Sequence, residues 1–180
     1  MGLRLSKESR EVEMARYASL RHSSDTSGAE QIAKRVFDVV VASCILLFTA
    51  PLILTIAIFI RLQDGGPAVF KQMRLGKDGE QFACYKLRSM VTDAGDRLQQ
   101  LLATDPDARR EWAETQKLTN DPRITALGQF IRKSSIDELP QLVNVIRGDM
   151  SLVGPRPIVE NEITKYGDQY KHYCAVRPGL

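Results

Sequence analysis

The chain has 180 residues, a formal net charge of +3 at pH 7 and 26% charged residues, which suits one compact domain with a hydrophobic core. This mildly basic balance fits an anionic ligand or an anionic membrane surface, but it does not indicate nucleic acid, and no nucleic-acid motif is visible. The three cysteines and two histidines show no metal-ligand spacing, so a zinc site is not expected.

The N-terminal segment, residues 1–33, is charged and rich in serine and lacks a sustained apolar period. Such a composition buries too little apolar surface to fold, so we expect a mobile tail. No apolar stretch follows its basic residues promptly, and we therefore do not expect a secretory signal peptide.

The least polar stretch of the chain is Val39–Ile60, which has 22 residues and no charge. As one straight helix it would be about 33 Å long, enough to cross a bilayer core of roughly 30 Å. An ordinary membrane span is therefore one interpretation of this stretch.

Two features favour instead a re-entrant helix, which enters and leaves the bilayer on one face. Pro51 lies in the middle of the stretch, where proline removes a backbone hydrogen bond and clashes with the preceding turn. Basic residues flank both ends, and the positive-inside tendency favours the cytoplasm at each: Lys34, Arg35 and Arg61. We expect a re-entrant helix hairpin over residues 34–62, broken at Pro51.

Residues 63–180 are soluble in character and are expected to form a cytoplasmic domain. Two segments that alternate apolar and polar residues, "AVFKQMRLG" and "EQFACYKLRSM", are joined by Gly76-Lys77-Asp78-Gly79. This pattern predicts a β-hairpin, because the Asp-Gly pair tolerates the positive φ angles of a tight turn.

Two helical regions follow the hairpin. Residues 94–117 are helical in composition but interrupted near Asp105-Pro106, and their broken apolar face favours core over the membrane surface as its contact. That face consists of Leu98, Leu101, Leu102 and Trp112. The segment "RITALGQFIRKS" predicts a short amphipathic helix that ends in Arg132 and Lys133. The predicted fold class is thus α+β and mostly helical, with a small hairpin and amphipathic interfacial helices.

A pair of acidic residues opens the next helix, in "SSIDELPQLVNVIRGDMSLVGPRP", residues 134–157. Pro140 is tolerated only in a first turn, so the helix should begin at or next to Asp137. Asp137 and Glu138 then lie at the positive end of the helix dipole, close to Arg132. An ionised carboxylate with a low pKa is expected there, suited to act as a nucleophile or a metal ligand.

Several cations complement the two acids. Arg156 is fixed between two prolines, and Lys86 and Arg88 lie two residues apart on the second hairpin strand. Taken singly, Asp137 fits a helix cap, Arg156 an exposed arginine and the hairpin cations a solvated strand face. Taken together, these residues predict a phosphate site with a charged nucleophile or a metal.

Four blocks in order resemble the bacterial sugar transferase family, the monotopic phosphoglycosyl transferases. They are "KRVFDVVVASCILLFTAPLIL", "FKQMRLGKDGEQFACYKLRSM", "SSIDELPQLVNVIRGDMSLVGPRP" and "YCAVRPGL". The resemblance covers residues 34–180, and its third block is highly specific. The short tail is similar to that of the small members that initiate exopolysaccharide synthesis, which typically transfer galactose or glucose phosphate.

The resemblance implies a two-step exchange on the cytoplasmic face of the bacterial inner membrane. Asp137 would attack the β-phosphate of a UDP-sugar, release UMP and hold the sugar phosphate, which undecaprenyl phosphate would then accept. Glu138 would assist with metal or proton handling, and Mg²⁺ held near Asp137 and Glu138 would neutralise the diphosphate. The phosphate-binding and nucleotide-binding cations implied are Lys86, Arg88, Arg132 and Arg156.

Two departures from the family pattern bear on this expectation. Ala50 stands before Pro51 where many members have serine, which would soften the bend. The family continues after "VRPG" with a segment that completes the nucleotide site, so an apparently truncated C-terminus is expected here. The alternative function is a catalytically weak, membrane-anchored scaffold of a glycan-assembly complex, which would bind other assembly proteins or anionic lipid. For either function the expected partners include inner-membrane lipid and a second copy of the chain or other glycan-assembly proteins.

Overall fold

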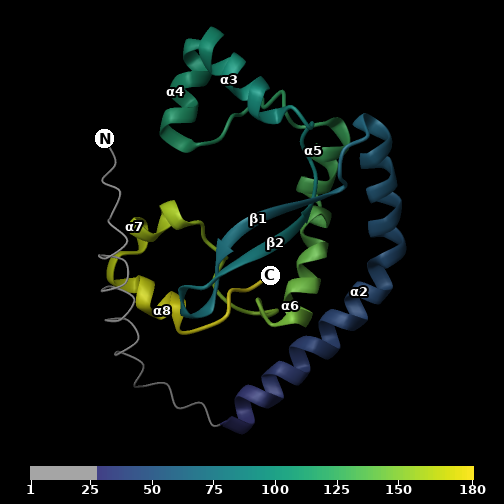
Figure 1. Cartoon of the computed structure of the whole chain (residues 1–180), viewed down its shortest axis with the longest axis vertical. Coiled ribbons are helices and arrows are strands. Elements are labelled where there is room, and N and C mark those ends of the chain that lie inside the picture. The colour runs from purple at the N-terminus through teal and green to yellow at the C-terminus, as the bar shows by residue number, and fades with distance from the viewer. Residues whose placement is uncertain (1–27) are drawn as a thin grey trace. The chain divides into compact units, whose positions relative to one another are not determined.

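The computed structural model describes residues 28–180 (Figure 1). The predicted tail therefore lies outside the described residues, except for positions 28–33. The chain divides into two compact units, each built from separate stretches, rather than the one domain that its length suggests. Of the described residues, unit 1 contains 28–48, Lys71–Cys84 and Gln141–Leu180, and unit 2 contains Thr49–Phe70 and Tyr85–Pro140.

The longest element is α2, Gly28–Asp64, a continuous helix of 37 residues with Pro51 inside it. The Thr55 hydroxyl donates a hydrogen bond of 2.8 Å to the Pro51 carbonyl oxygen, a side-chain contact of a kind that often bends helices. Among residues 28–180, α2 is the one helix long and apolar enough to cross a membrane. Its large apolar side chains are mostly exposed, with Leu47 at 79% and Phe48 at 88%.

The predicted hairpin is confirmed. Strands β1, Val69–Leu75, and β2, Gln81–Leu87, pair in a two-stranded sheet (Figure 1). The turn η1, Lys77–Gly79, places Asp78 at φ 60° and Gly79 at φ 75°, the positive φ angles that the Asp-Gly pair predicts.

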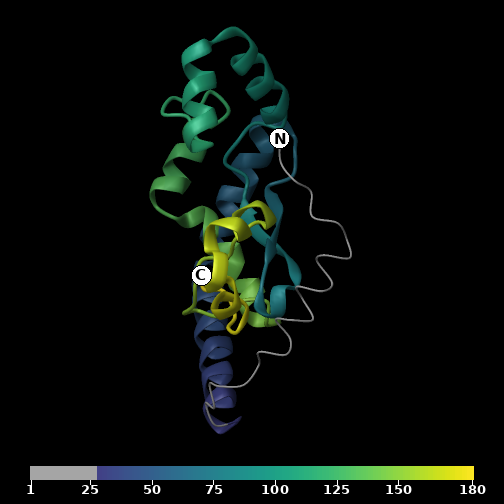
Figure 2. The same cartoon turned by 90° about the vertical axis from the view of Figure 1, so that its left-hand side faces the viewer.

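Unit 2 contains the predicted pair of short helices, α3, Ala94–Thr104, and α4, Pro106–Thr115, which contact each other (Figure 2). The break falls where predicted, because Asp105 caps α4 by accepting hydrogen bonds from the amides of Asp107 and Ala108. Neither helix has a fully buried residue, but the side chains of their apolar face, Leu98, Leu101, Leu102 and Trp112, are half-buried, so the core contact favoured for this face is only partly formed.

The core of unit 2 lies elsewhere. The helix α5, Ala126–Lys133, is capped by Thr125, whose hydroxyl oxygen accepts from the Gly128 amide, and it buries Ile131. Ile131 packs in one cluster with side chains of α2 and β2: Ile56, Ile60 and Leu87. This cluster packs the end of α2 against the end of β2 and against α5. It therefore fixes the backbone from which Arg88 and Arg132, the residues after Leu87 and Ile131, extend.

Unit 1 has a second core around the beginning of the hairpin turn. Tyr173 donates a hydrogen bond of 2.5 Å to the Leu75 carbonyl oxygen and accepts one from the Ile158 amide at 3.3 Å, and these residues pack with Tyr170. Among residues 28–180, unit 1 contains η1, part of α2 and five further helices: α6, Leu142–Arg147, η3, Glu160–Glu162, α7, Ile163–Tyr166, η4, Gly167–Gln169, and α8, Tyr170–Cys174.

Candidate active site around Asp137

The acidic pair lies at the start of η2, Ile136–Gln141, a 3-10 helix that contains Pro140. The predicted helix start is confirmed, although the first turn is 3-10 rather than α, and α6 follows directly after it. Ser135, two residues before Asp137, has φ 56°, a left-handed conformation that costs energy in a residue with a side chain. This turn connects α5 to the acids, and the Ser135 carbonyl oxygen accepts from the Glu138 amide at 3.2 Å.

Asp137 is only 8% exposed, and its environment changes the chemistry expected of it. Burial raises the pKa of the Asp137 carboxyl above its usual range, and the charge of Glu138 adds to this effect. The positive charges of Lys86 and Arg132 lower the pKa but do not offset burial. The prediction of a low pKa is therefore wrong, because desolvation outweighs the nearby cations.

Lys86 and Glu138 form an ion pair, with 2.6 Å between Lys86 Nζ and Glu138 Oε1. Their side chains are 27% and 42% exposed, so water screens this pair in part. Lys86 thus joins the end of β2 to η2 and acts electrostatically on both acids. The predicted association of Lys86 with the acidic pair is present within unit 2.

Arg132, near the end of α5, donates a hydrogen bond of 2.8 Å from Nε to the hydroxyl of Ser89. Ser89 is 8% exposed and follows directly after Arg88. This contact restrains an otherwise exposed guanidinium whose charge acts on Asp137. Arg132 therefore also belongs to the group around Asp137.

Arg88 has a different environment from Lys86. Its side chain is 9% exposed, and Nη2 donates to Asp64 and, at 3.3 Å, to the carbonyl oxygen of Ile60. Its Nε and Nη1 atoms are buried without a hydrogen-bond partner among residues 28–180. Asp64 was not a sequence candidate; the only sequence signal is an acid at the end of an apolar helix, before Gly65-Gly66.

Arg156 belongs to unit 1 and is exposed. The carbonyl oxygens on either side of it accept hydrogen bonds, that of Pro155 from the Gly179 amide at 2.8 Å and that of Pro157 from Arg74 Nη1 at 3.0 Å. The backbone on both sides of the guanidinium is thus held. Its association with Asp137 stays a prediction.

The donor set for a metal is small. Among residues 28–180, no group of three or more His, Cys, Asp and Glu side chains could hold a metal ion. Asp137 and Glu138 offer two carboxylates, one of which is engaged by Lys86. This set suits Mg²⁺, which takes one or two protein carboxylates and completes its coordination with water and substrate phosphates.

Comparison with known proteins finds similarity to the same family that the four sequence blocks resemble. The profile of the bacterial sugar transferase family matches residues 29–180. The undecaprenyl-phosphate galactose phosphotransferase of Salmonella typhimurium is 50% identical over 152 residues, which is 84% of this chain and 32% of that protein. The exopolysaccharide production protein ExoY of Rhizobium meliloti is 46% identical over 149 residues, 83% of this chain and 66% of that protein.

A more distant relative has a related name. The UDP-glucose:undecaprenyl-phosphate glucose-1-phosphate transferase of Escherichia coli is 36% identical over 162 residues, 88% of this chain and 32% of that protein. The chain spans about a third of the length of several of the curated relatives it matches. Since the family profile covers most of its residues, the chain belongs to the bacterial sugar transferase family.

Proposed function

We propose that this chain transfers a sugar-1-phosphate from a UDP-sugar to undecaprenyl phosphate and so initiates exopolysaccharide or another surface glycan. The observation that carries the proposal is Asp137, a buried carboxylate with a raised pKa on which the charges of Lys86 and Arg132 act. Perturbed carboxylates among cations are common in active sites and have little use in a scaffold. The names of the relatives indicate galactose or glucose as the sugar.

Asp137 is the nucleophile in this proposal. One of its carboxylate oxygens forms a bond to the β-phosphorus of the UDP-sugar, the bond from that phosphorus to the bridging oxygen breaks, and UMP leaves with the electron pair. A phosphate oxygen of undecaprenyl phosphate then attacks the same phosphorus and displaces the Asp137 carboxylate. The nucleophile is regenerated, and the product is undecaprenyl-diphosphate-sugar.

The environment of Asp137 favours the first step. Because burial strips water from the carboxylate, less solvent must be displaced before it attacks, and its raised pKa increases its basicity. Lys86 and Arg132 place positive charge where an anion must approach another anion. Arg88 and Arg156 are further phosphate-binding candidates.

Mg²⁺ is the proposed cofactor, and Asp137 and Glu138 are the residues that would hold it. When bound, it would supply positive charge that neutralises the diphosphate. Glu138 is divided between this role and its ion pair with Lys86, so Lys86 positions the Glu138 carboxylate.

We further propose that α2 inserts into the inner membrane as a re-entrant helix, with the remainder on the cytoplasmic face. Exposed side chains such as Leu47, Phe48 and Leu54 support insertion, since a core helix of a soluble protein would bury them. Pro51, which removes a backbone hydrogen bond inside α2 directly after Ala50, supports return to the same face. In a background without native cysteines, Glu30→Cys and Gln63→Cys should both react with a cytoplasmic-side reagent, and labelling from opposite sides would show a span instead.

The activity is tested with the detergent-solubilised chain, undecaprenyl phosphate, Mg²⁺ and labelled UDP-galactose or UDP-glucose. We expect UMP release and a labelled lipid product, and, when the lipid acceptor is omitted, an added mass of one sugar phosphate on the peptide containing Asp137. Asp93→Asn, which changes an exposed acid paired with Arg97, is the matched control and should retain activity. No UMP release by the wild-type chain would favour the scaffold alternative.

A further inference from the structure

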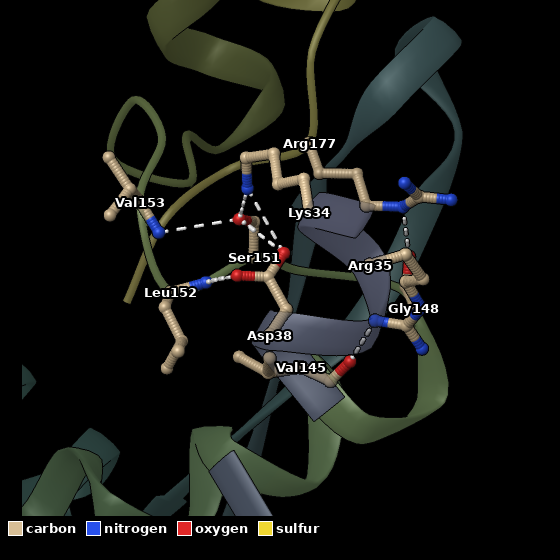
Figure 3. A network of polar contacts seen from close by, with 9 residues as sticks. All are labelled: Lys34, Arg35, Asp38, Val145, Gly148, Ser151, Leu152, Val153 and Arg177. Atoms are coloured by element: carbon tan, nitrogen blue, oxygen red, sulfur yellow. Dashed lines mark hydrogen bonds and ion pairs between the residues drawn. The ribbon is translucent and has the colours of Figure 1, made fainter. Parts of the chain in front are cut away.

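A polar network joins the first turns of α2 to the loop of residues 148–157, within unit 1 (Figure 3). Asp38 is at its centre and is only 4% exposed. Its Oδ2 atom accepts hydrogen bonds from the Ser151 hydroxyl at 2.8 Å and from Lys34 Nζ at 3.0 Å. Its Oδ1 atom accepts from the Leu152 amide at 3.2 Å. Three donors thus surround one buried carboxylate, directly before the uncharged part of α2.

The residue types of this network also occur in nucleophilic sites, where a lysine activates a serine. Lys34 Nζ does donate to the Ser151 hydroxyl oxygen (Figure 3). Ser151, however, is 2% exposed, and its own proton is donated to Asp38, so the hydroxyl does not face a substrate. The arrangement is therefore a structural link between α2 and the loop.

Arg35, which follows Lys34 in α2, binds the backbone just before the same loop. Arg35 donates from Nη1 to the Val145 carbonyl oxygen at 2.6 Å and from Nη2 to that of Ile146 at 2.8 Å. These carbonyls belong to the last turn of α6, where the Val145 carbonyl oxygen also accepts from the Gly148 amide at 3.1 Å. Gly148 ends α6 at φ 100°, and its carbonyl oxygen accepts from Arg177 Nε at 2.8 Å.

The end of the loop is held as well. Gly154 packs so closely that a Cβ atom there would lie 2.3 Å from the Arg177 carbonyl oxygen. Beyond it, the Pro155 and Pro157 carbonyl oxygens are bound by the Gly179 amide and by Arg74. Arg156 is the exposed cation between these two points. Its direction therefore depends on how the loop is fixed at Ser151 and Leu152, where Asp38 is the charged acceptor.

We propose that Asp38 is a positioning residue that acts through Ser151 and the Leu152 amide to orient the loop bearing Arg156, and thereby sets the affinity for the phosphates of the UDP-sugar. The inference rests on the proposed function, because it takes Arg156 as a phosphate-binding residue. It assigns a role in substrate binding to the polar beginning of α2, whose remainder is the proposed membrane anchor.

The test compares Asp38→Asn, Ser151→Ala and the double variant with the wild-type chain and with Asp93→Asn. We expect each single variant to raise KM for the UDP-sugar about tenfold while kcat changes little, because binding rather than chemistry is weakened. The two effects should be less than additive, since both substitutions break the same contact. Hydrogen exchange at the Leu152 and Val153 amides, which donate to Asp38 and Ser151, should accelerate in both variants.

Ser151→Ala keeps the Lys34–Asp38 ion pair and carries the test if Asp38→Asn does not fold. Unchanged KM and unchanged exchange in a folded Ser151→Ala protein would overturn the positioning role. A fall in kcat as large as the change in KM would also overturn it. So would a double variant whose KM effect equals the full sum of the two single effects. A wild-type chain that releases no UMP would instead defeat the proposed function, and the exchange measurement would still decide whether Asp38 fixes the loop.

Discussion

Asp38 and Asp137 are two aspartates of nearly equal burial, 4% and 8% exposed, in different units of the chain. Asp38 accepts hydrogen bonds from a lysine, a serine hydroxyl and a backbone amide. Asp137 has Lys86 and Arg132 acting on it by charge, yet burial raises its pKa above the usual range. The Asp38 carboxylate thus has hydrogen-bond donors that compensate its burial, whereas burial disfavours the ionised form of Asp137.

The difference distinguishes an anchor from a reactive group. A buried carboxylate with several donors resists both movement and reaction, because its lone pairs are occupied. A buried carboxylate whose charge is incompletely compensated keeps its lone pairs available for an electrophile. On this basis, substitutions at the two positions should have opposite consequences for activity and stability.

The largest effect is expected for Asp137→Asn in the UMP-release assay. If Asp137 is the nucleophile, the amide cannot form the covalent intermediate, and turnover should fall by at least about 10³-fold. Asp38→Asn, measured in parallel, should retain kcat within a few-fold. Wild-type turnover in Asp137→Asn would remove the distinction between the two aspartates and with it the proposed mechanism.

The local features of the fold and of the candidate site were predictable from the sequence. The Gly76–Gly79 turn, the break at Asp105-Pro106 and the helix start at Asp137 each depend on backbone preferences of a few adjacent residues, and the structure has all three. Nearby charge on Asp137 from Arg132 was also accessible, because the two residues are five positions apart.

The rest depends on residues that are distant in sequence. The pKa of Asp137 is set by burial, which the dipole argument from one helix does not include. Asp64 holds Arg88 from 24 positions away, and Asp38 binds Ser151 across 113 positions. A signal for Asp38 did exist, namely a lone acid four residues after Lys34 at the edge of an uncharged helix, but not for its partner.

The next largest effect concerns stability. Asp38→Asn should lower the free energy of unfolding by about 2–3 kcal/mol, because a charged acceptor is lost and the Lys34 ammonium and the Ser151 hydroxyl face a neutral amide. Lys34→Gln is the matched control, since its side chain is 53% exposed and should contribute under about 1 kcal/mol. Denaturant unfolding in detergent measures both, and equal losses would indicate that the ion pair, rather than the buried carboxylate, stabilises the loop.

The acid limb of the pH–rate profile offers a sharper test of Asp137. Activity requires the ionised carboxylate, so kcat/KM should fall as pH drops through a pKa above that of an ordinary aspartate. Lys86→Met removes a charge that lowers this pKa, and the limb should move to higher pH. Glu138→Gln removes a charge that raises the pKa of Asp137, so the acid limb should move to lower pH as long as Lys86 keeps its position. Shifts of the limb in the same direction for both variants would contradict the electrostatic assignment.

The smallest effect is on the stability of Asp137→Asn. Because the folded-state pKa is raised, the carboxyl contributes favourably below its unfolded pKa, and this contribution is lost as pH rises through the folded pKa. Ionised Asp137 therefore destabilises the fold at neutral pH, and Asp137→Asn should raise Tm slightly at pH 7 but not at acid pH. The pKa of Asp93 is shifted in the opposite direction, because its hydrogen bond with Arg97 lowers it. Asp93→Asn should therefore not raise Tm at pH 7. A lower Tm for Asp137→Asn at pH 7 would mean that Lys86 and Arg132 compensate the buried charge fully, and Asp137 would then be an anchor of the same kind as Asp38.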